Sequence, residues 1–306
     1  MNDRRVLIAE LPGGFGNQFF VFIAGYFFAK KTNRELVLDL TYVSHQHSKF
    51  DLEQLGLPHK IVRRRKNRLT KFIKKIKDSF NFQMKQFGSF AHLGQEVFDD
   101  LYNFVEEDIL NSDNRKIILK GFFHTFKYYG FSKGKVLEIL EKVYRDRAID
   151  LEFETIRKDS EIVVGIHVRR GDYLAEKHTL GVLSETYYLD ILNKLESELI
   201  DKSYCLVFFT DDRKFCENLL SNKEFKSDVV IRESHIDTDP LIDLILMTKC
   251  DKLFLSNSTF SLVAGLYTSG LVIAPLPLRI KSRNHENLDS DLPIQWTFMN
   301  AIWDSD

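Results

Sequence analysis

The second half of this chain alternates short apolar runs with stretches of helical pattern. Five apolar runs are expected to be strands, at 161–168, 204–210, 228–232, 252–256 and 271–275. Helical patterns lie between them, near 184–200, 213–222, 240–250 and 259–269. This alternation predicts βαβ units, and therefore a parallel sheet with helices on both faces.

The first half begins in the same way and then becomes less regular. A strand is expected at 5–10, then a glycine-rich loop, a helix over 18–31 and a strand at 35–40. Residues 117–123 (IILKGFF) predict a further strand. Because 306 residues exceed the usual size of one domain, we expect an α/β protein with two Rossmann-like parallel-sheet domains facing a cleft. A boundary before the run EIVVGI gives domains 1–155 and 156–306.

Composition and charge narrow the functional classes. The net charge is −1, from 43 basic and 44 acidic residues, so the whole molecule is not built to coat nucleic acid. The three cysteines lack metal-ligand spacing, and their apolar neighbours predict buried thiols in a reducing compartment. No stretch approaches the roughly 18 apolar residues of a membrane-spanning helix, and no secretory signal opens the chain. We therefore expect a cytoplasmic protein.

One segment is strongly basic. Residues 60–85 hold eleven Lys or Arg and a single acid, Asp78. Apolar residues at helical spacing predict a basic amphipathic helix there: Leu69, Phe72, Ile73 and Ile76. Such a helix is either a solvated surface element or a peripheral contact with an anionic membrane.

Polar residues follow the predicted strands at their C-terminal ends, where open α/β sheets bind ligands. Arg169 and Arg170 come directly after strand 161–168, and an arginine fork holds phosphate bidentately. Because successive side chains alternate around a strand, we expect Arg169 to face the ligand beside His167 and Arg170 to pair with an acid such as Asp172. This strand end predicts an anion site.

Two further strand ends carry candidate ligand contacts. In FFTDD (208–212), one of Asp211 and Asp212 is expected to cap the next helix, while the other can contact a base or ribose. Asp243 lies on the helix before strand 252–256. Three polar residues open the helix after that strand and predict a phosphate cradle: Asn257, Ser258 and Thr259.

The glycine loop LPGGFGNQF (11–19) resembles a dinucleotide fingerprint, but Gly14-Phe15-Gly16 is not followed by the third glycine. That break disfavours an NAD(P)-dependent oxidoreductase. The amides of Asn17 and Gln18 either cap the following helix or hydrogen-bond sugar hydroxyls. Three D-x-D triplets carry little information on metals, and an arginine with a helix N-terminus can neutralise a diphosphate without a cation.

With GGFGNQF, HVRRGDY, FFTDD and DLILMTKCDKLFLSNSTFS in this order, the chain resembles the α-1,2-fucosyltransferases of glycosyltransferase family 11. KGFFHTFKYYG (120–130) and LSETYYLDIL (183–192) are also similar to stretches of that family. The HVRRGDY core recurs in α-1,6- and protein O-fucosyltransferases, so it bears on the donor more than on the acceptor. Where the family usually has two tryptophans after NSTFS, this chain has Leu262 and Val263, and APLPL (274–278) also lacks a tryptophan often found there.

The resemblance implies an inverting, metal-independent transfer of L-fucose from GDP-β-L-fucose on a GT-B-like fold. The acceptor it implies is a galactoside hydroxyl, α-1,2-linked in the product, on a bacterial surface glycan or a lipid-linked oligosaccharide. In that scheme domain 1–155 lies on the acceptor side and domain 156–306 binds GDP-fucose. The alternatives are a fucosyltransferase of another linkage, a transferase using another GDP-sugar, or a non-catalytic nucleotide- or glycan-binding protein.

Carried over by position, two residues have catalytic roles, and a third is expected from its nearness in sequence. Arg169 matches the arginine on the β-phosphate, and Asn17 matches the asparagine that reaches toward fucose and the leaving oxygen. Asp172 is the expected general base, with Glu176 close by in sequence. The other expected donor contacts are Gly14 of the glycine loop, His167 near guanine, Asp211, Asp243 on the guanine N–H groups, and Asn257, Ser258 and Thr259 at the diphosphate.

Overall fold

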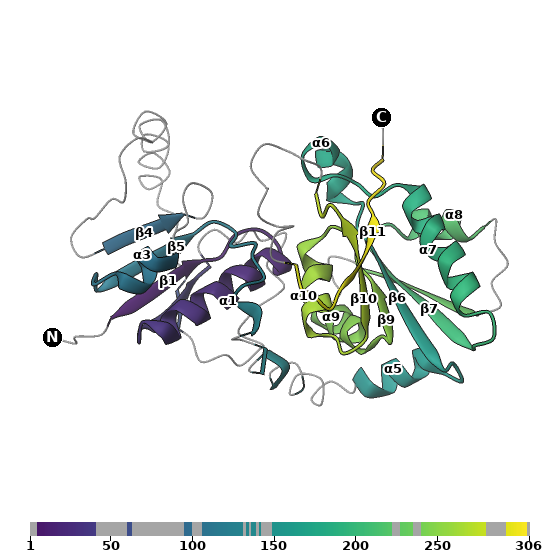
Figure 1. Ribbon diagram of the computed structural model, residues 1–306, viewed down its shortest axis with the longest axis horizontal. Helices are drawn as coiled ribbons and strands as arrows, with labels where there is room; N and C mark the ends of the chain where they lie inside the picture. The colour runs from purple at the N-terminus through teal and green to yellow at the C-terminus, as the bar shows by residue number, and fades with distance from the viewer. Residues whose placement is uncertain are drawn as a thin grey trace. The chain divides into compact units, whose positions relative to one another are not determined.

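The computed structural model describes residues 5–40, 60–62, 95–99, 106–130, 149–221, 227–234, 240–279 and 292–304, with single positions between 133 and 141. The described residues form two compact units, one ending at His124 and the other beginning at Thr125. Each unit is a parallel sheet flanked by helices (Figure 1), which confirms the prediction of two Rossmann-like domains.

The first unit holds a sheet of order β3-β2-β1-β5-β4. Its strands are β1 (Val6–Glu10), β2 (Glu35–Asp39), β3 (Lys60–Val62), β4 (Gln95–Asp99) and β5 (Lys116–Lys120). The helices are α1 (Phe15–Lys31), which packs on β1 and β2, and α3 (Glu106–Asn111). Helix α1 therefore begins three residues before the expected start at 18.

The less regular part of the first half contains elements that were not predicted. Residues 60–62 form β3, and the apolar positions of the expected basic helix, 69–76, lie outside the described residues. The stretch without predicted elements before residue 116 contains β4 and α3. Both are short, and QEVFD mixes charged with apolar residues, so neither gives a clear periodic signal.

The second unit holds a sheet of order β11-β10-β9-β6-β7-β8. Its strands are β6 (Ile162–Val168), β7 (Tyr204–Thr210), β8 (Asp228–Glu233), β9 (Lys252–Phe254), β10 (Leu271–Leu276) and β11 (Thr297–Asn300). All five strands expected in the second half are present, and the four-residue β11 is an addition.

Helices cover both faces of this sheet (Figure 1). Helices α7 (Glu185–Glu198) and α8 (Arg213–Leu220) pack on one face, and α9 (Pro240–Lys249) and α10 (Thr259–Tyr267) lie on the other. Three shorter elements complete the unit: α5 (Ile149–Arg157), the 3₁₀ helix η2 (Asp172–Glu176) and α6 (Lys177–Leu180).

The chain divides between the units earlier than the sequence boundary at 155. Rings of Phe126 and Trp296 lie 5.5 Å apart, and those of Tyr129 and Tyr267 lie 5.4 Å apart. Helix α5 packs on α9. These contacts attach the chain after His124 to the second sheet, so the boundary follows tertiary packing and not the end of the predicted helix before 155.

Strand β6 is buried on both faces, as a central parallel strand should be. Val164, Ile166 and Val168 pack in the core formed with α7 and α8. Gly165 faces the other side, where an added Cβ would lie 2.8 Å from Cys250 Sγ and 2.9 Å from Leu253 Cδ1. Position 165 therefore requires glycine, because Cys250, directly after α9, and Leu253 of β9 fill the space beside it.

The expectation of buried thiols is confirmed, because Cys205, Cys216 and Cys250 are all buried and free. Burial raises the pKa of Cys216 to about 12. Burial likewise raises the pKa of Cys250 far above its ordinary value. A thiol that stays protonated is a poor nucleophile, so these cysteines contribute packing and not reactivity.

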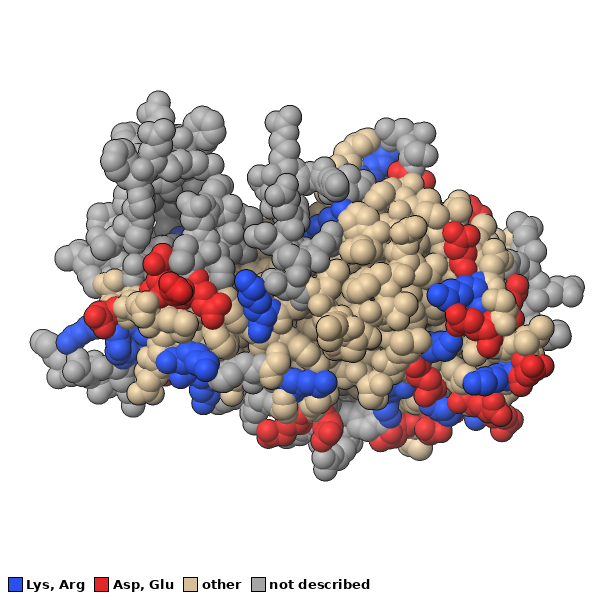
Figure 2. All heavy atoms as spheres, in the orientation of Figure 1, with Lys and Arg blue, Asp and Glu red and all other residues tan. Residues whose placement is uncertain are grey.

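Charged side chains of both signs are interspersed on the face of the molecule seen in Figure 2. In the second unit they form surface pairs such as Lys158–Asp228 at 3.1 Å and Lys252–Glu198 at 2.8 Å. Among the described helices, none combines the length and apolar character required to cross a bilayer.

The packing around Gly165 predicts that Gly165→Ala lowers the stability of the second unit by about 1–3 kcal/mol, the usual cost of overpacking. Thermal melts of wild type and variant measure the effect. Gly130→Ala is the matched control, since an added Cβ there meets no described atom within 4 Å. Equal melting temperatures for Gly165→Ala and wild type would contradict the packing described.

Candidate functional site

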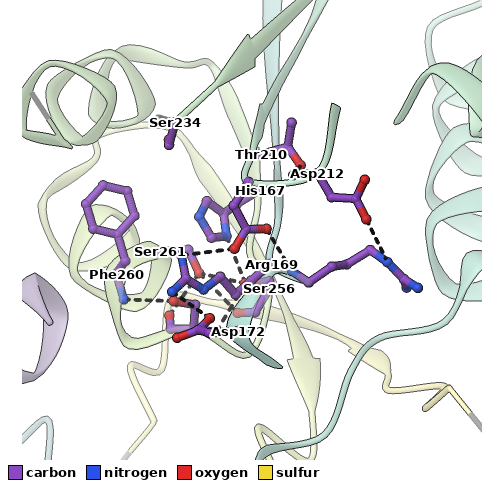
Figure 3. A network of polar contacts seen from close by, with 12 residues as sticks. His167, Arg169, Asp172, Thr210, Asp212, Ser234, Ser256, Phe260 and Ser261 are labelled. Carbon is purple, nitrogen blue, oxygen red and sulfur yellow. Dashed lines mark hydrogen bonds and ion pairs between the residues drawn. The ribbon is translucent and has the colours of Figure 1, made fainter. Parts of the chain in front are cut away.

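The C-terminal ends of the parallel strands of the second unit meet along one edge of the sheet. Four of them carry the polar residues drawn in Figure 3. His167 lies in β6 and Arg169 directly follows it, while Thr210 ends β7 and Asp212 follows two residues later. Ser234 follows β8, and Ser256 and Ser261 follow β9. The expected gathering of polar groups at this edge is thus present.

Arg169 lies between two carboxylates. Its Nη2 is 2.8 Å from Asp172 Oδ1, and its Nη1 is 3.1 Å from Asp211 Oδ2. The guanidinium also lies over the Tyr173 ring, 5.5 Å from its centroid. Its buried Nε has no hydrogen-bond partner among the described residues. Because a guanidinium has five N–H donors, Arg169 retains donors for a further anion.

Arg170 does not pair with Asp172, so that expectation is wrong. Its side chain turns to the opposite side of the strand, where it lies 3.5 Å from Asp212 and 3.2 Å from Asp304. The guanidinium stacks 4.1 Å from the centroid of the Phe215 ring. Asp172 opens the 3₁₀ helix η2 three residues after Arg169, and that turn brings it back to Arg169.

Asp211 connects the two arginines. Its Oδ1 accepts a hydrogen bond from the Arg170 backbone N–H at 2.8 Å, while Oδ2 pairs with Arg169. A Cβ added at Gly171 would lie 2.7 Å from Asp211 Oδ2. This contact therefore requires glycine in the loop formed by residues 169–171, the arginine loop. Asp212 is the N-cap of α8 and accepts from the Phe215 N–H at 3.0 Å. The capping role left open between the two aspartates belongs to Asp212.

His167 is buried against the start of α10. Its Nδ1 lies 2.8 Å from Ser256 Oγ, which also accepts from the Ser258 backbone N–H at 3.1 Å. Ser258 in turn is the N-cap of α10 and accepts from the Phe260 N–H at 3.3 Å. Burial, followed by the charge of Arg169, lowers the pKa of His167 from 6.5 to about 3. The imidazole is therefore neutral at physiological pH.

The two neighbours of Ser258 have different surroundings. Asn257 donates from Nδ2 to the carbonyls of Leu180 at 2.9 Å and Gly181 at 3.0 Å, which fastens the turn after α6. Its buried Oδ1 has no partner within the described chain. Thr259 is the first residue of α10 and is also buried.

Asp243 is buried in the first turn of α9, at 3% exposure. Its Oδ1 accepts from Arg232 Nε and its Oδ2 from Ser234 Oγ, both at 2.9 Å. Arg232 also pairs with Glu152 of α5. Hydrogen bonds to both of its carboxylate oxygens therefore hold the Asp243 side chain in one position.

Two more residues at this edge were not identified from the sequence. Tyr173, in η2, lies beside the Ser258 side chain, and burial raises the pKa of Tyr173, an effect opposed by the charges of Arg279 and Arg169. Arg279 follows β10, and burial lowers its pKa, with Tyr173 acting in the opposite direction. Arg279 follows a predicted strand, as the other site residues do, so its place after that strand could have identified it from the sequence.

The first unit contains the other two candidate residues, Gly14 and Asn17. Gly14 is the N-cap of α1, and its φ of −82° is ordinary for any residue. No described atom lies within 4 Å of an added Cβ, so neither backbone nor packing requires glycine there. Asn17 Oδ1 lies 3.0 Å from His124 Nε2, which places the proton on that nitrogen.

The start of α1 excludes a capping role for the two amides. Because the helix begins at Phe15, Asn17 and Gln18 lie inside its first turn. Gln18 is fully buried, and its Nε2 donates to the Gly13 carbonyl at 2.9 Å. Its Oε1 has no hydrogen-bond partner in the part of the chain that the structure describes.

The state of His167 gives a direct prediction. We expect the ring to stay neutral from pH 8 down to about pH 4.5, because its pKa is lowered to about 3. An unfolded chain takes up this proton near the ordinary pKa of 6.5, so stability contributed by His167 is lost as pH falls below about 6.5, at about 1.4 kcal/mol per unit. Ring-proton NMR shifts measure the titration, and the His167→Asn spectrum assigns the signal. A midpoint near pH 6 would contradict the burial described.

Alpha-1,2-colitosyltransferase of Escherichia coli is 26% identical over 286 residues, covering 89% of this chain and 92% of that protein. The O-antigen biosynthesis glycosyltransferase WbnK of Escherichia coli is 26% identical over 275 residues, covering 82% of this chain and 86% of that protein.

Among solved structures, a mutant of Arabidopsis thaliana FUT1 in complex with GDP matches with a TM-score of 0.54 at 12% identity. The match covers 94% of this chain and 73% of that one. This likeness supports the GT-B-type α/β fold. The model of glycosyl transferase family 11 matches residues 30–300. A match over most of the chain shows that this protein is a member of glycosyl transferase family 11.

Proposed function

We propose that this protein transfers L-fucose from GDP-β-L-fucose to a galactoside hydroxyl, with inversion, to form an α-1,2 linkage on a bacterial surface glycan. The observation that carries the proposal is the position of Arg169, which lies over the Tyr173 ring while Tyr173 lies beside the N-cap of α10. An arginine fork and a helix N-terminus beside one another form a strong site for a diphosphate. Membership of family 11 and the O-antigen role printed for WbnK point in the same direction.

The donor site is built to stabilise the leaving group. As the fucosyl–phosphate bond breaks, negative charge grows on the β-phosphate and the sugar gains oxocarbenium character. Arg169 binds that phosphate, and the N-terminal end of α10 adds a fixed helix dipole. Groups that are already in place for the developing charge lower the barrier more than they stabilise the bound substrate.

Two side chains of the second unit, Asp243 and His167, contact the guanine of GDP. The Asp243 carboxylate accepts from guanine N–H groups, and its position is fixed by Arg232 and Ser234. The neutral His167 ring lies beside guanine and is held through Ser256. Asp211 and Asn257 line the same edge of the sheet. Two residues of the first unit, Gly14 and Asn17, are proposed as further donor contacts on the basis of membership of family 11.

Asp172 acts as the general base, and the arrangement of charges explains how it becomes available. Before the donor binds, Asp172 pairs with Arg169 through a side chain that is 55% exposed. The diphosphate carries more charge than a carboxylate and replaces it on the guanidinium. Asp172 then accepts the proton of the acceptor hydroxyl while that oxygen attacks C1 of fucose and GDP departs.

No divalent cation takes part in this scheme, because Arg169 and the start of α10 neutralise the departing phosphate. The reaction belongs in the cytoplasm, where the basic segment 60–85 makes peripheral contact with anionic lipid close to a lipid-linked acceptor. A second candidate for the transferred sugar is colitose. This candidate is suggested by the alpha-1,2-colitosyltransferase of Escherichia coli, which aligns with 89% of this chain.

A transfer assay tests the function. Purified protein, GDP-β-L-fucose and a panel of galactosides in excess EDTA should release GDP and give an α-1,2-fucosyl product, identified by NMR. GDP-colitose and GDP-mannose in parallel reactions test the choice of donor. Arg169→Lys should lose most of kcat although it keeps the charge, because an ammonium lacks the bidentate fork. GDP binding without transfer to any acceptor would favour a binding protein, and loss of transfer in EDTA would overturn the metal-independent scheme.

Displacement of Asp172 predicts opposite effects on binding and turnover. Asp172→Asn should bind GDP up to about fivefold more tightly, because an exposed ion pair worth about 1 kcal/mol no longer competes for Arg169. Its kcat should fall about 100-fold through loss of the base. Calorimetry and steady-state kinetics measure the two effects.

Asp228→Asn is the matched control for Asp172→Asn. It removes a carboxylate of similar exposure, 52%, from a surface pair at the other end of the sheet. We expect its GDP affinity and kcat to equal those of wild type. Weaker GDP binding by Asp172→Asn would show that Asp172 supports Arg169 instead of competing with its ligand.

A further inference from the structure

A short segment after β11 lies against the chain that joins α6 to α7. The Ser184 N–H donates to the Ile302 carbonyl at 2.8 Å, and the Asp304 N–H donates to the Val182 carbonyl at 2.7 Å. Between these bonds, Leu183 and Trp303 form an antiparallel bridge. Backbone pairing therefore fixes the direction and register of segment 301–304.

Apolar contacts hold the same segment. Ala301, Ile302 and Trp303 pack against the core formed by β6, α7 and α8. The Ala301 N–H donates to the Leu276 carbonyl at the end of β10, at 2.9 Å. The segment is thus anchored from both sides, and Asp304 is carried to a defined position beside the strand ends.

At that position Asp304 contacts the guanidinium of Arg170. Asp304 Oδ2 lies 3.2 Å from Arg170 Nη2, which donates to it. Arg170 Nη1 donates to the Leu183 carbonyl at 3.4 Å, so the same guanidinium also contacts the residue that pairs with Trp303. The Arg170 side chain is only 13% exposed. A cation with so little exposure to solvent depends on its carboxylate partners. Besides Asp304, the partner is Asp212, whose Oδ2 lies 3.5 Å from Arg170 Nε.

Arg170 in turn holds the arginine loop through its backbone. Its N–H donates to Asp211, the carboxylate that pairs with Arg169, and its carbonyl accepts from the Leu174 N–H at 2.8 Å. One of these bonds sets the start of the loop, and the other sets the 3₁₀ helix that carries Asp172. Without Asp304, the Arg170 guanidinium keeps one carboxylate partner among the described residues, Asp212, which also caps α8.

We infer that Asp304 is a positioning residue of the donor site, which acts through Arg170 to fix the loop bearing Arg169 and Asp172. The inference rests on the proposed function only in taking GDP as the ligand of that loop. It assigns a role in binding to a residue 134 positions from Arg170 in sequence.

The test compares Asp304→Asn, Asp304→Glu and wild type by GDP calorimetry, thermal melting and steady-state kinetics. Asp304→Asn should weaken GDP binding roughly tenfold, as expected for loss of a hydrogen bond between charged groups. The KM for the acceptor should not change. Asp304→Glu keeps a carboxylate and should restore GDP affinity to within about threefold of wild type.

Asp228→Asn again serves as the matched carboxylate, and its GDP affinity should equal that of wild type. We expect the melting temperature of Asp304→Asn to shift no more than that of this control. Unchanged GDP affinity in Asp304→Asn, or a loss of affinity that accompanies a large fall in melting temperature and is not rescued by Glu, would overturn the inference. Failure of wild type to bind GDP would instead reject the proposed function.

Discussion

The contact between Asp211 and the two adjacent arginines is the constraint on which the strand-end arrangement depends. One carboxylate accepts the Arg170 backbone N–H and pairs with the Arg169 side chain. Two neighbouring guanidinium groups at the end of a buried strand would repel each other without nearby anions. Asp211 at the end of the adjacent strand β7 relieves that repulsion, and the absence of a side chain at Gly171 lets it approach.

The same arrangement recurs at three arginines of the candidate site, each of which contacts two carboxylates. Arg169 pairs with Asp172 and Asp211, Arg170 with Asp212 and Asp304, and Arg232 with Glu152 and Asp243. Under the proposed function, an incoming diphosphate would add negative charge and would replace one of these carboxylates. Asp172 is the most exposed of the six, at 55%, and belongs to a short 3₁₀ helix, so it is the least costly to displace. Asp243, at 5%, is the most fixed.

The departures from the family pattern lie in the core of the second unit. Leu262 and Val263, which stand where the family usually has two tryptophans, are fully buried in α10. Smaller residues there change how α10 packs on its neighbours, and they do not remove a side chain from the polar edge. Residues 274–278 belong mostly to β10, whose interior positions are also buried. The unusual residues therefore bear on packing behind the site, while the donor-side polar residues keep the family's order.

The sequence by itself determined the elements of both sheets that have strong periodicity, and the strand ends at which polar residues gather. It also determined that Arg169 and Arg170 point to opposite sides, because side chains alternate along any strand. These properties are local, and a few neighbouring residues suffice to encode them. The position of the caps at Asp212 and Ser258 is local for the same reason.

Only the tertiary structure decided which acid meets which arginine. Asp172 was expected beside Arg170 and lies beside Arg169, because the 3₁₀ turn after Gly171 carries it there. The partners of Arg170 and Arg232 include Asp304 and Glu152, which are brought in by the segment after β11 and by α5. Such pairings depend on sheet order and on how distant segments pack, and no periodicity within either segment records them. The division after His124 has the same cause. Phe126 and Tyr129 contact Trp296 and Tyr267 of the second unit, so the chain joins that unit well before residue 155.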